Sequence, residues 1–304
     1  MHNYLPVVAG GLKHYVSPDR GYEIIWQLAV ARGRSESDAR REARELLKRW
    51  DGNYTPSATT APAPVKIGPD IERIKSIVSR SSVAVYDLWE ASPMRFDERD
   101  DSGAHYALSQ LFEPDEIICV SGHKKGGYAG TIRELLKRGH RFEFESYIVP
   151  NPLNSRDATE GHTLARSLDN VAYRRWLVLE WDISRFGRDG KTPTFWKPLI
   201  EDWESRGISI KDAQATLIDH MAKFAKPAMI VDFAGKSLHT WFPALGMTDK
   251  FLTEFCRYAV LLGANDATKT ISQLVRMPGG TRETIMTQPI IYFNLQLINS
   301  NKRN

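Results

Sequence analysis

The chain has 304 residues, of which 42% are hydrophobic and 26% charged, with a formal net charge of +4. This composition is typical of a globular protein and excludes a wholly disordered chain, while the mild positive charge permits a polyanionic partner. Cys119 and Cys256 are the only cysteines, which excludes a disulfide framework and favours a reducing, cytoplasmic setting. No segment resembles a membrane span or a signal peptide, so we expect no membrane partner.

The first 54 residues predict a small helical module. Apolar residues recur at helical spacing from residue 22 onward, and residues 35–38 offer a start signal for a second helix. Residues 55–69 are rich in proline and small side chains, which predicts a linker. We therefore expect the main domain to cover residues 70–304.

The main domain mixes strand and helix signals, which predicts an α+β (or α/β) fold without internal repeats. Runs of β-branched and aromatic residues predict strands at 116–120, 144–149, 176–182, 228–233, 237–242 and 290–296. Helical periodicity predicts helices at 131–138, 212–224 and 248–262.

Two acids end the predicted strand "WLVLEWD". Glu180 and Asp182 are two residues apart, so both side chains lie on the same face of the strand. Neighbouring carboxylates repel each other unless a cation neutralises them, and Mg²⁺ and Mn²⁺ prefer oxygen ligands. The pair predicts a metal site, and the alternative is a strand whose polar end simply reaches solvent.

The segment "VDFAGKSLHTWF" has polar residues between two apolar runs. Ser237 and His239 are again two residues apart and share one face of the predicted strand, directly after Lys236. A hydroxyl and an imidazole on one face suit a phosphate ligand, and the alternative is a hairpin with a polar, solvent-facing side.

A third segment starts at Asp266 and ends in "VRMPGGTR". Arg276 and Arg282 flank the turn at residues 278–280, and their guanidinium groups suit phosphate binding. Together the three segments contain three carboxylates, a serine, a histidine and arginines, which are the groups that two-metal phosphoryl or nucleotidyl transfer needs.

The motifs "LEWD", "GKSLH" and an aspartate before "VRMPGGTR" occur in an order that resembles the archaeo-eukaryotic primase superfamily. The likeness is to the primase-polymerases of phages, plasmids and other mobile genetic elements, and it covers about residues 83–296, including "DLWEASPMRF" and "RRWLVLEWD". It implies a catalytic core with an RRM-like sheet, preceded here by the helical module. That module more faintly resembles primase-associated helical domains, and a docking or dimerisation unit is the alternative.

By position, the resemblance assigns roles to individual residues. Glu180, Asp182 and Asp266 match the acids that hold two Mg²⁺ or Mn²⁺ ions, with Asp232 as the alternative third acid. Glu180 stands where aspartate is commoner in the family. For nucleotide binding, the resemblance matches Ser237, His239 and Arg276. Lys236 and Arg282 join this set as neighbouring basic groups suited to phosphate. Apart from the resemblance, local clusters of positive charge predict template contacts for a basic set: Lys124, Lys125, Arg174 and Arg175. For the two lysines, a solvated loop is the alternative.

The resemblance implies a template-directed DNA primase or polymerase that acts in DNA replication. Such an enzyme transfers nucleotides from nucleoside triphosphates to a primer or an initiating nucleotide on single-stranded DNA. A replicative helicase in a separate chain would be a further partner. Two alternatives stay open: a non-catalytic DNA-binding module in replication initiation, and a metal-dependent phosphodiesterase that uses the same acids.

Overall fold

The computed structural model describes residues 22, 25–26, 29–30, 34–48, 68–96, 102–122, 127–157, 165–184, 194–233, 237–282 and 286–302. It divides the chain into two compact units, Met1–Lys66 and Ile67–Asn304. This division lies within the predicted linker. Among the described helices, none combines the length and apolarity that a membrane crossing needs.

The first unit contains helix α3 (Glu36–Lys48). The helix starts where the sequence predicts, because the Ser35 hydroxyl accepts a hydrogen bond from the Asp38 backbone N–H at 3.1 Å. Ala43 is fully buried and packs in a small cluster with Tyr22 and Ile25, two residues that are themselves helical. The role of this module stays a prediction.

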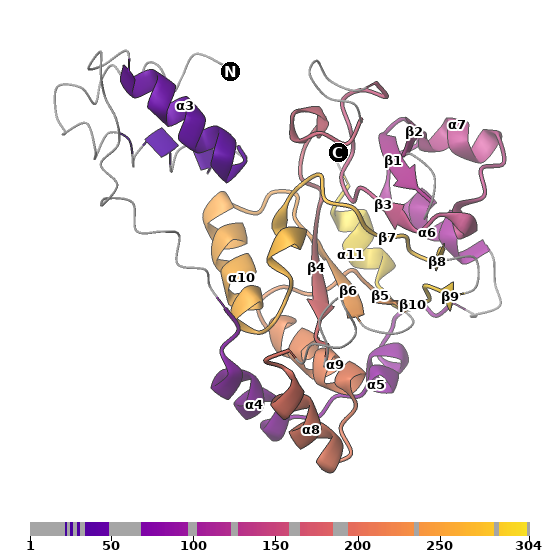
Figure 1. Ribbon diagram of the computed structural model, residues 1–304. Coiled ribbons are helices and arrows are strands. Elements are labelled where there is room, and N and C mark those ends of the chain that lie inside the picture. Colours follow the sequence, from indigo (N-terminus) through magenta and orange to yellow (C-terminus); the bar gives the residue numbers. More distant parts are fainter. Residues whose placement is uncertain are drawn as a thin grey trace. The chain divides into compact units, whose positions relative to one another are not determined.

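The main sheet of the second unit has four strands in the order β10-β5-β6-β4, all antiparallel to their neighbours (Figure 1). The strands are β4 (Trp176–Asp182), β5 (Met229–Phe233), β6 (Ser237–Pro243) and β10 (Ile290–Phe293). Helices α8 (Lys197–Ser205) and α9 (Ile210–Met221) connect β4 to β5, and α10 (Asp249–Leu261) follows β6. Along the chain this is the strand–helix–strand–strand–helix–strand pattern of split β-α-β folds.

Alternating side chains of this sheet enter two separate cores. Leu177, Leu179 and Trp181 of β4 pack with helices α8, α9, α10 and α4 (Ile71–Arg80). The intervening Trp176 and Val178 point into a second core on the other face. Both faces of the sheet are therefore covered, as its nearly unbroken apolar strands require.

The second core also contains a smaller sheet, with strand order β2-β1-β3-β7. Its strands are β1 (Ile117–Ser121), β2 (Tyr128–Thr131), β3 (Tyr147–Ile148) and β7 (Val275–Arg276). Helices α6 (Ser102–Leu111), α7 (Ile132–Lys137) and α11 (Leu295–Ser300) complete this core. The remaining described elements are short: α5 (Val85–Glu90), η1 (Phe142–Phe144), η2 (Leu168–Asn170), η3 (Asp266–Lys269), β8 (Thr281–Arg282) and β9 (Met286–Thr287).

Antiparallel sheets combined with helices confirm the predicted α+β class. Two strand predictions are wrong in their extent. The strand predicted at 290–296 ends at Phe293, because the Asn294 side chain accepts a hydrogen bond from the Leu297 N–H at 3.1 Å and begins helix α11. In the segment 144–149, only Tyr147 and Ile148 form a strand.

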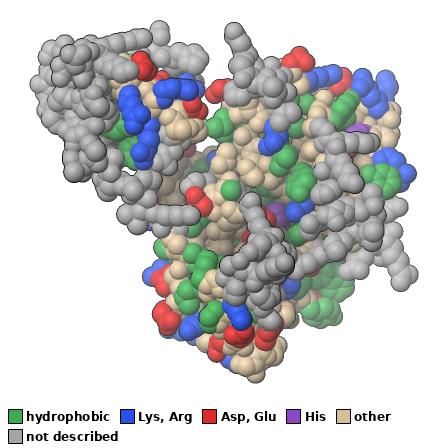
Figure 2. Space-filling model, viewed as in Figure 1, with side chains coloured by type: hydrophobic (Ala, Val, Ile, Leu, Met, Phe, Trp, Pro, Cys, Tyr) green, Lys and Arg blue, Asp and Glu red, His purple; other side chains and the backbone are tan. Residues whose placement is uncertain are grey.

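Opposite charges are interspersed on the visible face of the second unit, most clearly over helices α4 and α8 (Figure 2). In α8, Lys197 lies 3.8 Å from Glu201, and both side chains are largely exposed. On this face, the described charges of the second unit are thus mixed in sign.

Candidate active site

Four predicted site residues lie on one face of the main sheet. In the register of β4 and β6, Glu180 lies opposite His239, and Asp182 lies opposite Ser237. Directly opposed residues of antiparallel strands point to the same side. On the same face of β4, Trp176 and Val178 pack into the second core. The four polar residues lie beyond them, toward the end of the strand.

His239 links the other polar groups. Its Nε2 atom lies 3.5 Å from Glu180 Oε1 and 3.3 Å from Ser237 Oγ. His239 is 3% exposed and Ser237 1%. The second ring nitrogen, Nδ1, is also buried and has no hydrogen-bond partner among the described residues. Glu180 and Ser237 therefore hold the imidazole through Nε2, and Nδ1 is a buried nitrogen without a partner in the described chain.

Glu180 is kept in its ionised form. Burial alone would raise the pKa of Glu180, but the hydrogen bond and electrostatic interaction with His239, the hydrogen bond from the Asn265 amide and the charge of Arg276 outweigh it. The pKa of Glu180 therefore lies below its ordinary value. Asn265 donates from Nδ2 to Glu180 Oε2 at 3.1 Å, and its backbone N–H donates to the Glu180 carbonyl oxygen at 2.8 Å.

Arg276 approaches this face from the smaller sheet. It pairs with Tyr147 in the register of β7 and β3. Its guanidinium carbon lies 3.8 Å from the centre of the Phe233 ring and 4.6 Å from that of Tyr147. Because Phe233 lies opposite Ser237 in the main sheet, these stacking contacts hold the arginine charge beside the predicted nucleotide site.

The turn after Arg276 depends on its glycines. Gly279 has a φ of +68°, which favours glycine. A Cβ atom on Gly280 would lie 2.2 Å from the carbonyl oxygen of Glu145, so only glycine fits this close approach. The motif "RMPGG" thus packs its backbone against the segment that precedes β3.

The two candidates for a third acid occupy different positions relative to this face. Asp232 alternates onto the opposite face of β5, where it pairs with Lys211 of α9. Asp266 is exposed in η3, which packs against β4, and its neighbour Asn265 bonds to Glu180. In the described part of the chain, no three Asp, Glu, His or Cys side chains lie close enough to hold a metal ion together.

The donor set on this face fits a hard divalent cation with few protein ligands. Asp182 is exposed at the strand end, and Glu180 is an ionised carboxylate on the same face. Mg²⁺ is commonly bound by one or two carboxylates, completed by water and substrate phosphates. The pair can therefore hold one such ion, whereas a two-metal arrangement with Asp266 stays a prediction.

The template contact predicted for Arg175 is wrong. Its side chain is 0% exposed, and Nη1 donates to the Leu111 carbonyl oxygen at 3.1 Å. Nη2 donates to Tyr173 Oη at 2.8 Å and pairs with Glu116 at 2.7 Å. This arginine stabilises the start of β4 and cannot reach DNA.

Among the other predicted basic residues, the structure describes the side chain of Arg174. Arg174 is partly buried, and burial lowers its pKa against the raising effects of Cys256 and Asp249. Four predicted binding groups lie outside the described residues and side chains: Lys124, Lys125, Lys236 and the side chain of Arg282.

Sequence reasoning missed two residues of this region. Asn265 holds Glu180, and Lys211 donates from Nζ to the carbonyl oxygens of Phe233 and Ser237, each at 3.0 Å. Lys211 also binds Asp232, so it joins both strands of the β5–β6 hairpin that presents Ser237. Neither residue belongs to a motif, and only their contacts reveal them.

Comparisons with known proteins give one structural similarity. No protein family and no curated protein matches the sequence. Among solved structures, the chain is similar to the AEP domain of the cyanophage S-2L primase-polymerase, PP-N190. The identity is 13% and the TM-score 0.36, over 66% of this chain and 97% of that domain.

Proposed function

We propose that the chain is a template-directed nucleotidyltransferase, a DNA primase-polymerase that extends a primer or an initiating nucleotide on single-stranded DNA. The observation that carries the proposal is the shared polar face of the main sheet. There, the carboxylates of Glu180 and Asp182 lie opposite His239 and Ser237, with the Arg276 guanidinium beside them. These groups come from three motifs that are far apart in the sequence, and their chemistry suits nucleotidyl transfer.

Asp182 and Glu180 would hold the divalent cation, Mg²⁺ or Mn²⁺. A bound ion of this kind lowers the pKa of an attacking hydroxyl and neutralises charge on the transferred phosphate. The contacts of Asn265 and His239 with Glu180 keep that carboxylate ionised and oriented before any ligand arrives. Preorganised groups of this kind need little rearrangement during the reaction.

Ser237, His239 and Arg276 would bind the triphosphate. His239 can donate a hydrogen bond to a phosphate oxygen, and its orientation is fixed by Glu180 and Ser237. Arg276 supplies a planar guanidinium group suited to phosphate oxygens. Lys236 and Arg282 join this set in the proposal because of their positions in the sequence beside Ser237 and the "RMPGG" turn.

Nucleotide incorporation tests the proposal. The full chain is incubated with single-stranded DNA, with and without a primer, in the presence of labelled nucleoside triphosphates and Mg²⁺ or Mn²⁺. We expect metal-dependent products longer than a dinucleotide from the wild type and none from Asp182→Asn. Asp202→Asn, an exposed acid on α8, is the matched control and should retain full activity.

The products also separate the alternative functions. Shortened DNA would indicate a metal-dependent phosphodiesterase that uses the same acids. Binding of DNA without extension or cleavage would indicate a non-catalytic replication-initiation module. Equal extension by the wild type and Asp182→Asn would refute the assigned role of this face.

A further inference from the structure

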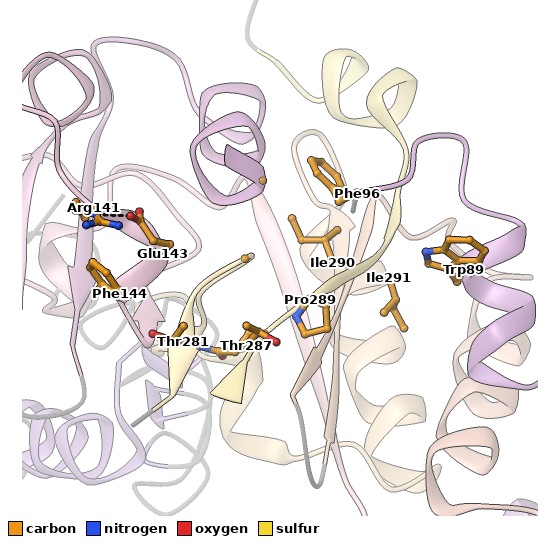
Figure 3. Close-up of a pocket in the computed structure, with 13 residues that line it drawn as sticks. Trp89, Phe96, Arg141, Glu143, Phe144, Thr281, Thr287, Pro289, Ile290 and Ile291 are labelled. Atoms are coloured by element: carbon orange, nitrogen blue, oxygen red, sulfur yellow. Dashed lines mark hydrogen bonds and ion pairs between the residues drawn. The ribbon is translucent and has the colours of Figure 1, made fainter. Parts of the chain in front are cut away.

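A groove runs beside strand β10, next to the turn that contains Gly279. Its cavity volume is about 150 Å³, and residues from α5, η1 and the β8–β10 region line it. Phe144 lies at one end, Trp89 at the other, and Pro289 to Ile291 run between them (Figure 3). We call this feature the β10 groove. For scale, an apolar cavity of about 150 Å³ accommodates one benzene ring, so the groove fits flat, single-ring groups.

Each end of the β10 groove carries an aromatic ring paired with an arginine. The guanidinium carbon of Arg141 lies 4.2 Å from the centre of the Phe144 ring, and Phe144 is 55% exposed. The guanidinium carbon of Arg95 lies 4.4 Å from the Trp89 ring. The Trp89 ring is partly buried and also stacks on Tyr86. An exposed aromatic ring with an adjacent arginine, as at Phe144, is the combination by which proteins stack unpaired bases and neutralise phosphates.

Polar groups line the middle of the groove. Thr281 and Thr287 lie on the two strands of the β8–β9 hairpin (Figure 3). Gln288 is fully buried, donates from Nε2 to the Ser146 carbonyl oxygen at 3.2 Å, and has an Oε1 atom without a hydrogen-bond partner in the described chain. A ligand that brings only apolar surface would leave this acceptor unmatched, which favours a ligand with polar edges.

The groove is aligned with the candidate active site. Glu180, His239, Val231 and Ile290 are direct neighbours in register and form one row across the main sheet. Ile290 lines the groove. Adjacent strands lie about 4.8 Å apart, so three strand spacings place the groove roughly 14 Å from Glu180.

We propose that the β10 groove binds unpaired bases of single-stranded DNA, which stack on Phe144 and Trp89. Arg141 and Arg95 would contact the neighbouring phosphates. Arg141 uses Nε for Glu143 and is 61% exposed, and an arginine has further N–H donors. The proposal rests on the proposed function, because it identifies the groove as the path of the template beside the nucleotide site.

Binding in the absence of nucleotide and metal tests this assignment. Fluorescence anisotropy compares two labelled 12-mers, oligo(dT) and a fully abasic strand with the same phosphate backbone. Phe144→Ala should weaken oligo(dT) binding at least about fivefold, the equivalent of one base–aromatic stack worth about 1 kcal/mol or more. The same change should leave binding of the abasic strand unaltered, and Phe144→Trp should retain oligo(dT) binding.

Phe224→Ala is the matched control, because Phe224 is also 55% exposed but packs on Tyr258 outside the groove. Equal binding of oligo(dT) by the wild type and Phe144→Ala would overturn the proposal, as would an equal loss on the abasic strand. Failure of wild-type protein to bind oligo(dT) at low salt would also overturn it.

The same protein preparations distinguish this inference from the proposed function. A Phe144-dependent effect on oligo(dT) without any nucleotide incorporation would retain the groove and refute the polymerase. Nucleotide incorporation by the wild type, together with oligo(dT) binding that does not depend on Phe144, would support the polymerase and refute the groove assignment.

Discussion

Lys211→Met should destabilise the second unit by loosening the β5–β6 hairpin that presents Ser237. The Lys211 ammonium binds the carboxylate of Asp232 and the carbonyl oxygens of Phe233 and Ser237. These three contacts join helix α9 to both strands at the end of the β5–β6 hairpin. Methionine preserves much of the side-chain volume but removes the charge and all three hydrogen bonds, so the expected loss is electrostatic.

The contacts set the expected size of the effect. Removing one partner of a buried ion pair costs about 3–5 kcal/mol. Lys211 and Asp232 are each 22% exposed, so water can partly solvate the remaining carboxylate, and a loss of about 2–3 kcal/mol is expected. For a domain of this size the melting temperature falls by about 2–4 °C per kcal/mol, which predicts a decrease of about 4–12 °C.

Thermal unfolding followed by tryptophan fluorescence measures this loss. Of the eight tryptophans, only Trp26 and Trp50 precede the second unit, so the signal reports mainly on that unit. Lys197→Met is the control, because Lys197 forms an exposed ion pair with Glu201 and should change stability by less than about 0.5 kcal/mol. A melting temperature for Lys211→Met equal to that of the control would refute the reasoning.

Two further predictions concern a ligand and a thiol. His239→Ala should weaken binding of a nucleoside triphosphate with Mg²⁺ by about 1.5–3 kcal/mol in calorimetric titration, the worth of a hydrogen bond to a charged group. Burial raises the pKa of Cys119 to about 11, so at pH 8 a thiol reagent should modify the partly buried Cys256 and spare Cys119. Because the folded pKa exceeds the unfolded value of about 8.5, this thiol should lower stability as pH rises from about 8.5 toward 11, measured by urea unfolding.

Each of these predictions has a control. His220→Ala, on α9 and hydrogen-bonded to Tyr258, should not change nucleotide binding, and equal affinity of His239→Ala and the wild type would contradict the site assignment. Cys119→Ala should show a smaller loss of stability between pH 8.5 and 10 than the wild type. Rapid modification of Cys119 in folded Cys256→Ser would contradict its burial.

The sequence alone indicates the α+β class and most strands of the main sheet, because their apolar runs and turn residues act locally. It also determines that Glu180 shares a face with Asp182, and Ser237 with His239. This follows from the two-residue period of a strand, whatever the rest of the chain does.

Burial of charged residues cannot be read from the sequence in the same way. Arg174 and Arg175 are adjacent and chemically identical in the sequence. Only the packing of Glu116, Tyr173 and the Leu111 carbonyl around Arg175 makes it part of the core. A buried charge depends on partners brought from distant segments, and these have no periodic signal.

The tertiary structure alone decided which residues meet across the site. The antiparallel register joins Glu180 to His239, and the start of η3 brings Asn265 to Glu180. The smaller sheet brings Arg276 against Phe233. It also turned Asp232 away toward Lys211. Periodicity assigns a side chain to a face of its own strand, whereas the neighbour on that face depends on register and packing between segments far apart in the chain.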